Sequence, residues 1–385
     1  MIPAVIVALG LILTLAAPAR AWEGFDIAPC TNHGAKWRIG YLEGGPYFNY
    51  ARNLEALARG LTALGWMEAP NLPGLPADGD TAEIWSALAT RTRSDYLQFV
   101  PDAWYSAGWS PAARGHVRRA LLERLQSGDL DLVLAAGTWA GQDLALPAHH
   151  VPVVAFAVSD PVLSGIVPPL GTRGLPNVHV KMDPERYLRM ARLFHNVFGF
   201  RRLGVTYENS PEGRAHAGVD DMARAAEAMG FSLVLCEAQF SGVSDEAAVD
   251  GVVRCQERLA READAVVIPV HRGVRPSAMS RILAPLLAAR IPTFSQQGSL
   301  EVRHGVLMGM TLGEAAFTQI GLFHARVVAA ILNGAVPAEV PMVFEDPRGI
   351  AINRETARRI GWRVPPGLEQ CTETFYDAIA PDDEE

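Results

Sequence analysis

The chain has almost no lysine: Lys36 and Lys181 are the only two, and arginine supplies nearly all of its positive charge. The formal net charge is −8, and no stretch of the sequence concentrates basic residues. A nucleic-acid-binding protein needs a basic surface to neutralise phosphates, so this composition argues against a nucleic-acid partner. We attribute the preference for arginine to codon usage rather than to phosphate recognition.

The sequence also lacks the short motifs of common enzyme classes. It contains no G-x-S-x-G, H-E-x-x-H or G-x-x-x-x-G-K-[ST] motif. Its first predicted strand-loop-helix unit has no G-x-G-x-x-G turn, so we expect no dinucleotide and no other cofactor. His149 and His150 precede a predicted strand instead of following one, and we interpret them as loop residues, not as metal ligands. These absences favour a binding protein, and a secreted enzyme is the less favoured alternative.

Cysteine is scarce too. There is no C-x-x-C motif, which argues against a zinc site and against thiol redox chemistry. An even number of cysteines permits disulfides in an exported chain, and four cysteines allow three sets of pairings, which the sequence leaves open. Cys30 could pair with Cys371 near the two ends, and Cys236 with Cys255 between a strand and the following helix.

The N-terminus does carry a recognisable signal. Residues 2–18 are apolar and are followed by Ala19-Arg20-Ala21, a small-x-small pattern. This arrangement predicts a signal peptide over residues 1–21 and a periplasmic location, although no basic residue precedes the apolar run. A retained membrane anchor is the alternative, but the run is short for a membrane span. At the other end, residues 377–385 form an acidic tail.

Between these ends, short apolar runs alternate with segments of helical periodicity. The alternation predicts an α/β protein whose parallel sheets are covered by helices on both faces. The pattern restarts near residue 180, which predicts two Rossmann-like lobes. The predicted strands are 37–42, 96–100, 131–136, 151–158, 202–207, 231–236, 265–269, 291–294 and 306–310. The predicted helices are 49–64, 81–91, 111–126, 141–146, 183–198, 210–229, 245–262, 276–290 and 313–332.

The predicted topology indicates where a ligand would bind. Right-handed connections bring the carboxyl ends of parallel strands to one edge of each sheet, and ligands bind outside that edge. Backbone N–H groups and a hydroxyl at Gly137 and Thr138 could hold a carboxylate, or Thr138 could simply cap the next helix. Aromatic residues at the same edge favour a pocket over packing alone. The candidate ligand-binding residues are Gly45, Tyr47, Gly137, Thr138, Trp139, Ser159, Asp160, Tyr207, Asn209, His271, Arg272, Gln296 and Gln297.

Several blocks of sequence together resemble a known family. They occur in order as RIG at 38–40, DLVLAAGT at 131–138, PVVAFAVSDP at 152–161, RRLGVTY at 201–207 and RIPTF at 290–294. The chain resembles the ABC-transporter substrate-binding proteins of the tryptophan/tyrosine-binding type over most of residues 37–376. The resemblance implies the type I periplasmic-binding-protein fold, in which three crossings join the lobes. We expect the crossings near 160–164, 309–313 and 342–346, an N-terminal lobe of 36–161 plus 312–341, and a C-terminal lobe of 162–310 plus 346–376.

The resemblance also implies a function. We expect a monomeric, non-enzymatic, extracytoplasmic solute-binding protein that closes around a small polar metabolite, anionic or aromatic, and delivers it to the permease of an ABC-type importer. A periplasmic sensor that reports the ligand to a histidine kinase or chemoreceptor is the alternative, since the same two-lobed closure would serve both.

The chain departs from the family at two places. Residues 68–95 form an insertion without an assigned role. Family members that bind amino acids tend to carry an aspartate after the strand that corresponds to 265–269, where this chain has Pro269-Val270-His271-Arg272-Gly273. An α-amino acid ligand is therefore in doubt. An anionic ligand, or a neutral one rich in hydrogen-bond acceptors, suits His271 and Arg272 better, because arginine binds carboxylates with two parallel hydrogen bonds, unless Arg272 points to solvent.

Overall fold

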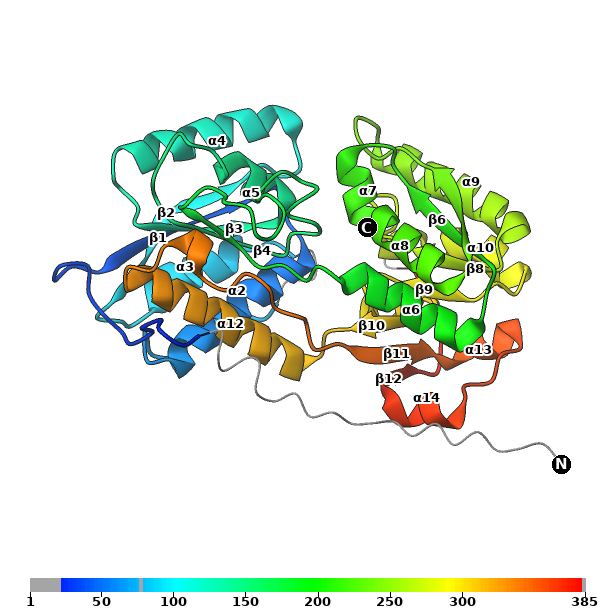
Figure 1. The fold of residues 1–385 in the computed structure, drawn as a ribbon. Coiled ribbons are helices and arrows are strands. Elements are labelled where there is room, and N and C mark those ends of the chain that lie inside the picture. The colour runs from blue at the N-terminus through cyan, green and yellow to red at the C-terminus, as the bar shows by residue number, and fades with distance from the viewer. Residues whose placement is uncertain (1–21, 76–78, 383–385) are drawn as a thin grey trace.

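The computed structural model describes residues 22–75 and 79–382. The predicted signal peptide and the last three residues of the acidic tail lie outside the described residues. Two α/β lobes lie side by side, each built around its own sheet (Figure 1). The predicted fold class, two parallel sheets flanked by helices, is confirmed.

The first lobe contains a five-stranded parallel sheet in the order β2-β1-β3-β4-β5. Its central strands are apolar runs that are buried on both faces, as in β3, where all five residues are buried. Helices α2, α3 and α12 cover one face, and α4 and α5 cover the other. The strands are β1 (Trp37–Glu43), β2 (Leu97–Ser106), β3 (Leu132–Ala136), β4 (Val153–Phe156) and β5 (Val178–Val180). The helices are α2 (Phe48–Ala63), α3 (Ala82–Arg91), α4 (Pro111–Gln126), α5 (Gly137–Leu144) and α12 (Glu314–Leu332).

The second lobe contains a seven-stranded sheet in the order β12-β11-β10-β9-β8-β6-β7, in which only the β10–β11 pair is antiparallel. Its strands are β6 (Arg202–Tyr207), β7 (Ser232–Glu237), β8 (Ala265–Ile268), β9 (Thr293–Ser295), β10 (Met308–Thr311), β11 (Gly349–Asn353) and β12 (Thr372–Tyr376). Its helices are α6 (Arg186–Phe198), α7 (Pro211–Ala217), α8 (Val219–Met229), α9 (Asp245–Glu262), α10 (Met279–Ala288), α11 (Ser299–Arg303), α13 (Arg354–Ile360) and α14 (Pro366–Cys371), with a short 3₁₀ turn at Pro276–Ala278. A second 3₁₀ turn, Pro337–Glu339, packs against β5 of the first lobe.

The first crossing between the lobes differs from the expectation. Strand β5 pairs with β4, so the chain stays with the first sheet until Val180 and crosses at 181–185. The expected crossing near 160–164, and with it the lobe boundary at 161/162, is therefore wrong. Strand β5 was missed because it has only three residues and follows a long loop rich in proline and glycine. The other two crossings run from β10 to α12 and from the 3₁₀ turn at Pro337–Glu339 to β11.

Charged side chains hold the first and third crossings together. Lys181 lies 2.6 Å from Asp346, which also pairs with Arg348 at 2.9 Å, and all three side chains are largely buried. Backbone hydrogen bonds join Met182 to Met342 and Phe344. The segments between the lobes are thus a defined hinge with its own ion pairs.

The insertion at 68–95 belongs to the core of the first lobe. It contains α3, whose Trp85 is buried against Tyr41 and Phe99 and donates a hydrogen bond to Val100 O. The Thr81 hydroxyl donates to the buried carboxyl of Glu43 at 2.7 Å. The insertion therefore supplies a helix that covers one face of β1 and β2.

Two helices of the first lobe approach unusually closely. A Cβ added at Gly321 of α12 would lie 2.1 Å from Ala56 O, and one at Gly60 of α2 would lie 2.4 Å from Gly321 O. Only glycine permits this contact, because any side chain would meet the backbone of the neighbouring helix. Helix α12 is long and apolar enough to cross a membrane, but 72% of its most apolar window is buried within the lobe, which identifies it as a core helix.

One disulfide joins Cys236 at the end of β7 to Cys255 in α9. Cys30 and Cys371 are not bonded to each other. Of the pairings that the sequence left open, only the one inside the second lobe is formed.

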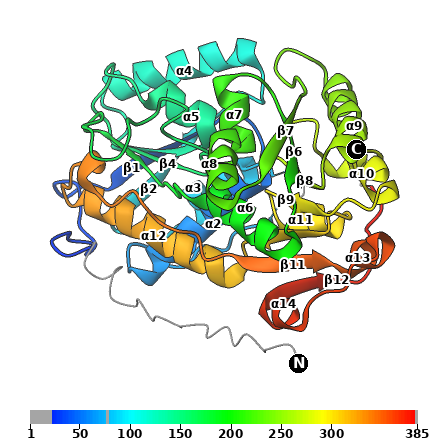
Figure 2. The same cartoon turned by 45° about the vertical axis from the view of Figure 1, so that its right-hand side comes forward.

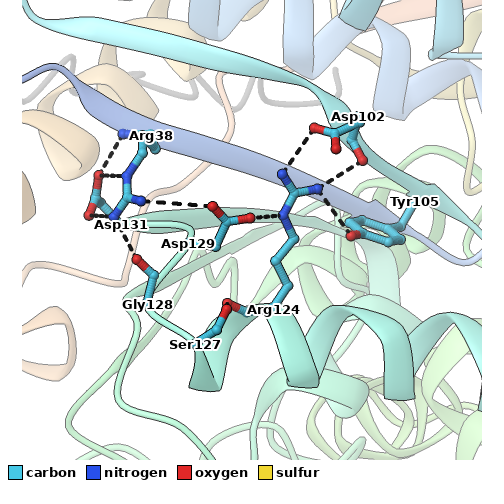
Figure 3. Close-up of polar contacts among 8 residues, drawn as sticks. All are labelled: Arg38, Asp102, Tyr105, Arg124, Ser127, Gly128, Asp129 and Asp131. Carbon is cyan, nitrogen blue, oxygen red and sulfur yellow. Dashed lines mark hydrogen bonds and ion pairs between the residues drawn. The ribbon is translucent and has the colours of Figure 1, made fainter.

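Both sheets are tied at the starts of their strands by an arginine–aspartate pair. Arg38 at the start of β1 binds Asp131, just before β3, through Nε at 3.0 Å and a terminal nitrogen at 2.9 Å (Figure 3). Asp131 also accepts a hydrogen bond from the Arg38 backbone N–H. Asp129 and Arg124 extend this network toward Asp102 of β2. In the second lobe, Arg202 at the start of β6 binds Asp264, just before β8, at 2.8 Å.

Candidate functional site

The carboxyl ends of the two sheets face each other and touch at two points. The Tyr47 hydroxyl, after β1, donates to Gln297 Oε1, after β9, at 3.2 Å. The indole N–H of Trp139 in α5 donates to Glu212 Oε1 in α7 at 3.2 Å, and these two helices lie side by side in Figure 2. Residues more than 70 positions apart thus meet where the topology predicts a ligand site.

The first lobe presents an aromatic wall at this edge, formed by Tyr47, Tyr50, Trp109 and Trp139. The ring centroids of Tyr47 and Tyr50 are 5.1 Å apart, those of Tyr50 and Trp109 6.3 Å, and those of Trp109 and Trp139 5.6 Å. Gly45 lies beneath Trp109, and a Cβ added there would be 2.6 Å from the indole ring. Tyr50 was not predicted, because it lies within the predicted helix at 49–64, whereas Trp109 follows the predicted strand at 96–100 and was a candidate to extend such a wall or to anchor the loop.

Gly137 and Thr138 open α5 directly at the end of β3. Gly137 has φ +84°, and a Cβ added there would lie 1.7 Å from the Tyr50 hydroxyl, so glycine is required. Thr138 is buried, and Ala136 occupies the N-cap position. Thr138 therefore lies within the helix and does not cap it.

Ser159 and Asp160 follow β4, as predicted, but Asp160 has a local role. Its Oδ1 accepts hydrogen bonds from the backbone N–H groups of Val162 and Leu163 at 3.0 and 2.9 Å. Asp160 thus closes a turn, and its negative charge also acts on Asp221 and Arg224 of α8 in the second lobe.

Tyr207 and Asn209 lie at the end of β6, and Asn209 is exposed. Between them, Glu208 is buried and accepts hydrogen bonds from the N–H groups of Phe240 and Ser241, both at 2.7 Å. Burial opposes ionisation of Glu208, but these hydrogen bonds outweigh it and lower the pKa of the carboxyl. Glu208 holds the loop after β7 against the end of β6.

The structure does not support His271 and Arg272 as ligand-binding residues. The His271 ring is buried, with Nε2 3.0 Å from Ala238 O, and Nδ1 accepts from the Gly273 N–H at 2.9 Å. Both nitrogens are thus used, and burial lowers the pKa of the ring. Arg272 donates to Val243 O and pairs with Asp245 at 3.3 Å, at the start of α9. Because hydrogen bonds fix the His271 ring inside this turn, the side chain of Arg272 extends along the turn toward α9.

The two glutamines after β9 have different roles. Gln296 is fully buried: its amide donates to Ala217 O at 2.7 Å and accepts from the Val270 N–H at 3.0 Å. Gln297 is partly exposed, contacts Tyr47 across the lobes and donates to Glu301 at 2.9 Å. Gln296 therefore shapes the edge, whereas Gln297 lies at the meeting surface.

Three residues at this edge were not predicted. Arg186 and Tyr187 begin α6, immediately after the first crossing, and Arg186 donates to Gln296 O at 3.1 Å. Glu301 of α11 is buried, and burial raises the pKa of its carboxyl to about 8. The misplaced first crossing explains the omission of Arg186 and Tyr187, since it put them inside a lobe and not at its edge.

Among residues 22–75 and 79–382, no three His, Cys, Asp or Glu side chains gather in a way that could hold a metal ion. The strand ends instead offer stacking surfaces and hydrogen-bonding groups, which suit recognition of a small molecule.

A family model described as ABC transporter substrate binding protein matches residues 113–370. Among curated proteins, none matches the chain in sequence. Similar solved structures include an ABC domain from Streptococcus pneumonia in complex with L-Trp (TM-score 0.61, 17% identity, 88% of this chain and 99% of that chain covered). They also include the ligand-free, open form of a substrate-binding protein with adhesive properties from Clostridium difficile (0.59, 19%, 88% and 99%).

A third similar structure is a solute-binding protein of an ABC transporter from Rhodopseudomonas palustris BisB5 with 3,4-dihydroxybenzoic acid (TM-score 0.52, 10% identity, 79% of this chain and 84% of that chain covered). At these identities the likeness shows the fold alone, which is that of type I periplasmic binding proteins.

Proposed function

The chain belongs to the ABC transporter substrate-binding protein family, and from this premise we propose that it is the extracytoplasmic solute-binding protein of an ABC-type importer. The family consists of binding proteins and not of enzymes. The observation that carries the proposal is the meeting of strand-end residues from both lobes, Tyr47 with Gln297 and Trp139 with Glu212. Closure about the hinge would bring these groups together around a solute.

The lining of the edge supports a small ligand with an aromatic part. The aromatic wall offers ring faces and edges, and aromatic pairs contribute beyond the area that they bury. Two of the similar structures contain aromatic acids, L-tryptophan and 3,4-dihydroxybenzoic acid. We propose that this chain binds a small aromatic or anionic metabolite.

Export and partnership complete the proposal. The apolar run at residues 2–18 and Ala19-Arg20-Ala21 support cleavage of a signal peptide and a periplasmic location. The proposed partner is the permease of an ABC importer, to which the closed, loaded protein would dock as a monomer. The proposed lobes are 36–180 with α12, and 186–311 with 349–376.

A thermal-shift screen of the mature protein against a broad panel of metabolites tests the proposal. A ligand at a hundredfold excess over its Kd stabilises the folded state by about 2.7 kcal/mol, which raises the melting temperature measurably. If no solute in the panel raises it, the proposed function is rejected.

A further inference from the structure

Arg186 is a cation at the edge of the site that forms no ion pair with another described residue. Its guanidinium donates to Gln296 O, directly after β9, and lies with Cζ 5.0 Å from the centroid of the Tyr187 ring. Its Nε is buried and has no hydrogen-bond partner among the described residues. Burial raises the pKa of Tyr47 in the opposite lobe, and the nearby positive charge of Arg186 acts in the other direction.

Tyr187 adds a second unused donor beside it. The residue is 3% exposed, and its hydroxyl has no hydrogen-bond partner among the described residues. Its ring packs against the backbone at Gly218, where a Cβ would lie 2.4 Å from it. A buried hydroxyl without a partner costs free energy, so an acceptor at this position would be stabilising.

The charged residues of the hinge leave a net positive charge around Arg186 and Tyr187. Asp346 is shared by Lys181 and Arg348, and Asp183 pairs with Arg189, so the two carboxylates whose charges act on Arg186 are each paired with other cations. Arg348 is buried, and its pKa falls to about 10 because of that burial and the nearby charge of Arg186. Glu301 does not compensate, since its raised pKa keeps it largely protonated at pH 7.

The geometry points to a carboxylate subsite formed by the Arg186 guanidinium and the Tyr187 hydroxyl, between the ends of the two sheets and beside the aromatic wall. This inference rests on the proposed function and names its ligand class: a small aromatic compound with a carboxylate group. Arginine is suited to this role because its planar donors match a carboxylate. The sequence predicts Arg272 as the cation that binds the ligand's anionic group, and in this proposal Arg186 takes that role.

Pairs of acids and their amides, which lack the carboxylate, test the subsite. Isothermal titration calorimetry at pH 7 would compare benzoate with benzamide, 3,4-dihydroxybenzoate with its amide, indole-3-acetate with its amide, and L-tryptophan with L-tryptophanamide. We expect at least one acid to bind wild-type protein more than tenfold more tightly than its amide. Arg186→Gln should weaken that acid about 10- to 100-fold, and Tyr187→Phe roughly fivefold, with little change for the amide.

Two further variants separate the subsite from general damage. Arg272→Gln removes an arginine that is paired with Asp245 and should keep the preference for the acid. Arg186→Lys keeps the charge and should restore part of the affinity, and melting curves would confirm that each variant folds.

Each outcome decides between the two proposals. The subsite is refuted if acid and amide bind alike, if Arg186→Gln keeps the preference, or if wild-type protein binds other solutes of the metabolite panel but none of these acids. In all three cases the proposed function stands. If wild-type protein binds no solute at all, both proposals fail.

Discussion

The two lobes begin their central strands alike and end them differently. At the strand starts, Arg38 with Asp131 and Arg202 with Asp264 occupy equivalent positions, each tying the first residues of a strand to its neighbour. At the strand ends, the first lobe presents the aromatic wall, whereas the second presents amide, carboxyl and guanidinium groups. The arginine–aspartate pair is common to both lobes and ties the strands of each sheet together, whereas the strand-end groups that differ between the lobes face the proposed ligand site.

This asymmetry gives a ligand an orientation. A molecule with one aromatic and one anionic end would place its ring against the first lobe and its charge at Arg186 of the second. The lobes also differ in how they are held together, because only the second contains a disulfide among the described residues.

The largest expected effect comes from removing the disulfide of the second lobe. Reduction of Cys236–Cys255, or the double change to serine, should lower the free energy of unfolding by about 3 kcal/mol, since the bridge closes a loop between residues 19 apart. Denaturant unfolding with and without reductant measures this loss. Cys371→Ser, at an exposed unbonded cysteine, is the control and should have no effect. Equal midpoints in both conditions would show that the bridge does not form in the protein.

The second prediction tests the shared feature. Asp131→Ala should cost about 2 kcal/mol of unfolding free energy, because it removes charged hydrogen bonds to the Arg38 side chain and backbone. Asp264→Ala should cost less, because the Asp264 side chain is 36% exposed against 13% for Asp131. Urea titration of both variants gives the order. A larger loss for Asp264→Ala would contradict the assigned difference in burial.

The third prediction uses the raised pKa of Glu301. The folded state holds this proton up to about pH 8, whereas the unfolded chain releases it near pH 4.5. Stability should therefore fall as pH rises from about 4.5 to 8 and then level off. Glu301→Gln should lack this part of the pH dependence in melting curves. An unchanged pH profile in the variant would mean that Glu301 is ionised in the folded protein.

The smallest expected effect concerns the contact between the lobes. Trp139→Phe keeps an aromatic ring but removes the donor to Glu212, so the closed form loses one hydrogen bond. We expect roughly fivefold weaker ligand affinity and little change in the melting temperature without ligand. Titration of the variant with the best ligand of the metabolite panel measures the affinity. An unchanged affinity would show that the contact between Trp139 and Glu212 does not contribute to closure.

Much of the fold could be predicted from the sequence. Strands such as β3 and β8 are continuous apolar runs between helices of clear periodicity, and such runs can only be buried in a sheet covered on both faces. Strand β5 could not be predicted, because its three residues carry too short a pattern. The predicted helix at 210–229 is two helices, α7 and α8, because Gly218 adopts a left-handed conformation between them.

The candidate site was predicted in position more than in detail. Tyr47, Trp139 and Gln297 follow strands and do meet at the edge, since topology alone places them there. Arg272 also follows a strand, but its direction depends on the hydrogen bonds of His271, which no sequence pattern reveals. Arg186 reaches the edge from a hinge whose position depends on β5.

The central claim is that the two lobes close around a small molecule. Small-angle X-ray scattering of the mature protein, without ligand and with a saturating amount of the panel's best ligand, tests it most directly. The account predicts a smaller radius of gyration with ligand and a scattering curve that matches the contacting lobes described above. Identical curves with and without a bound ligand would contradict it.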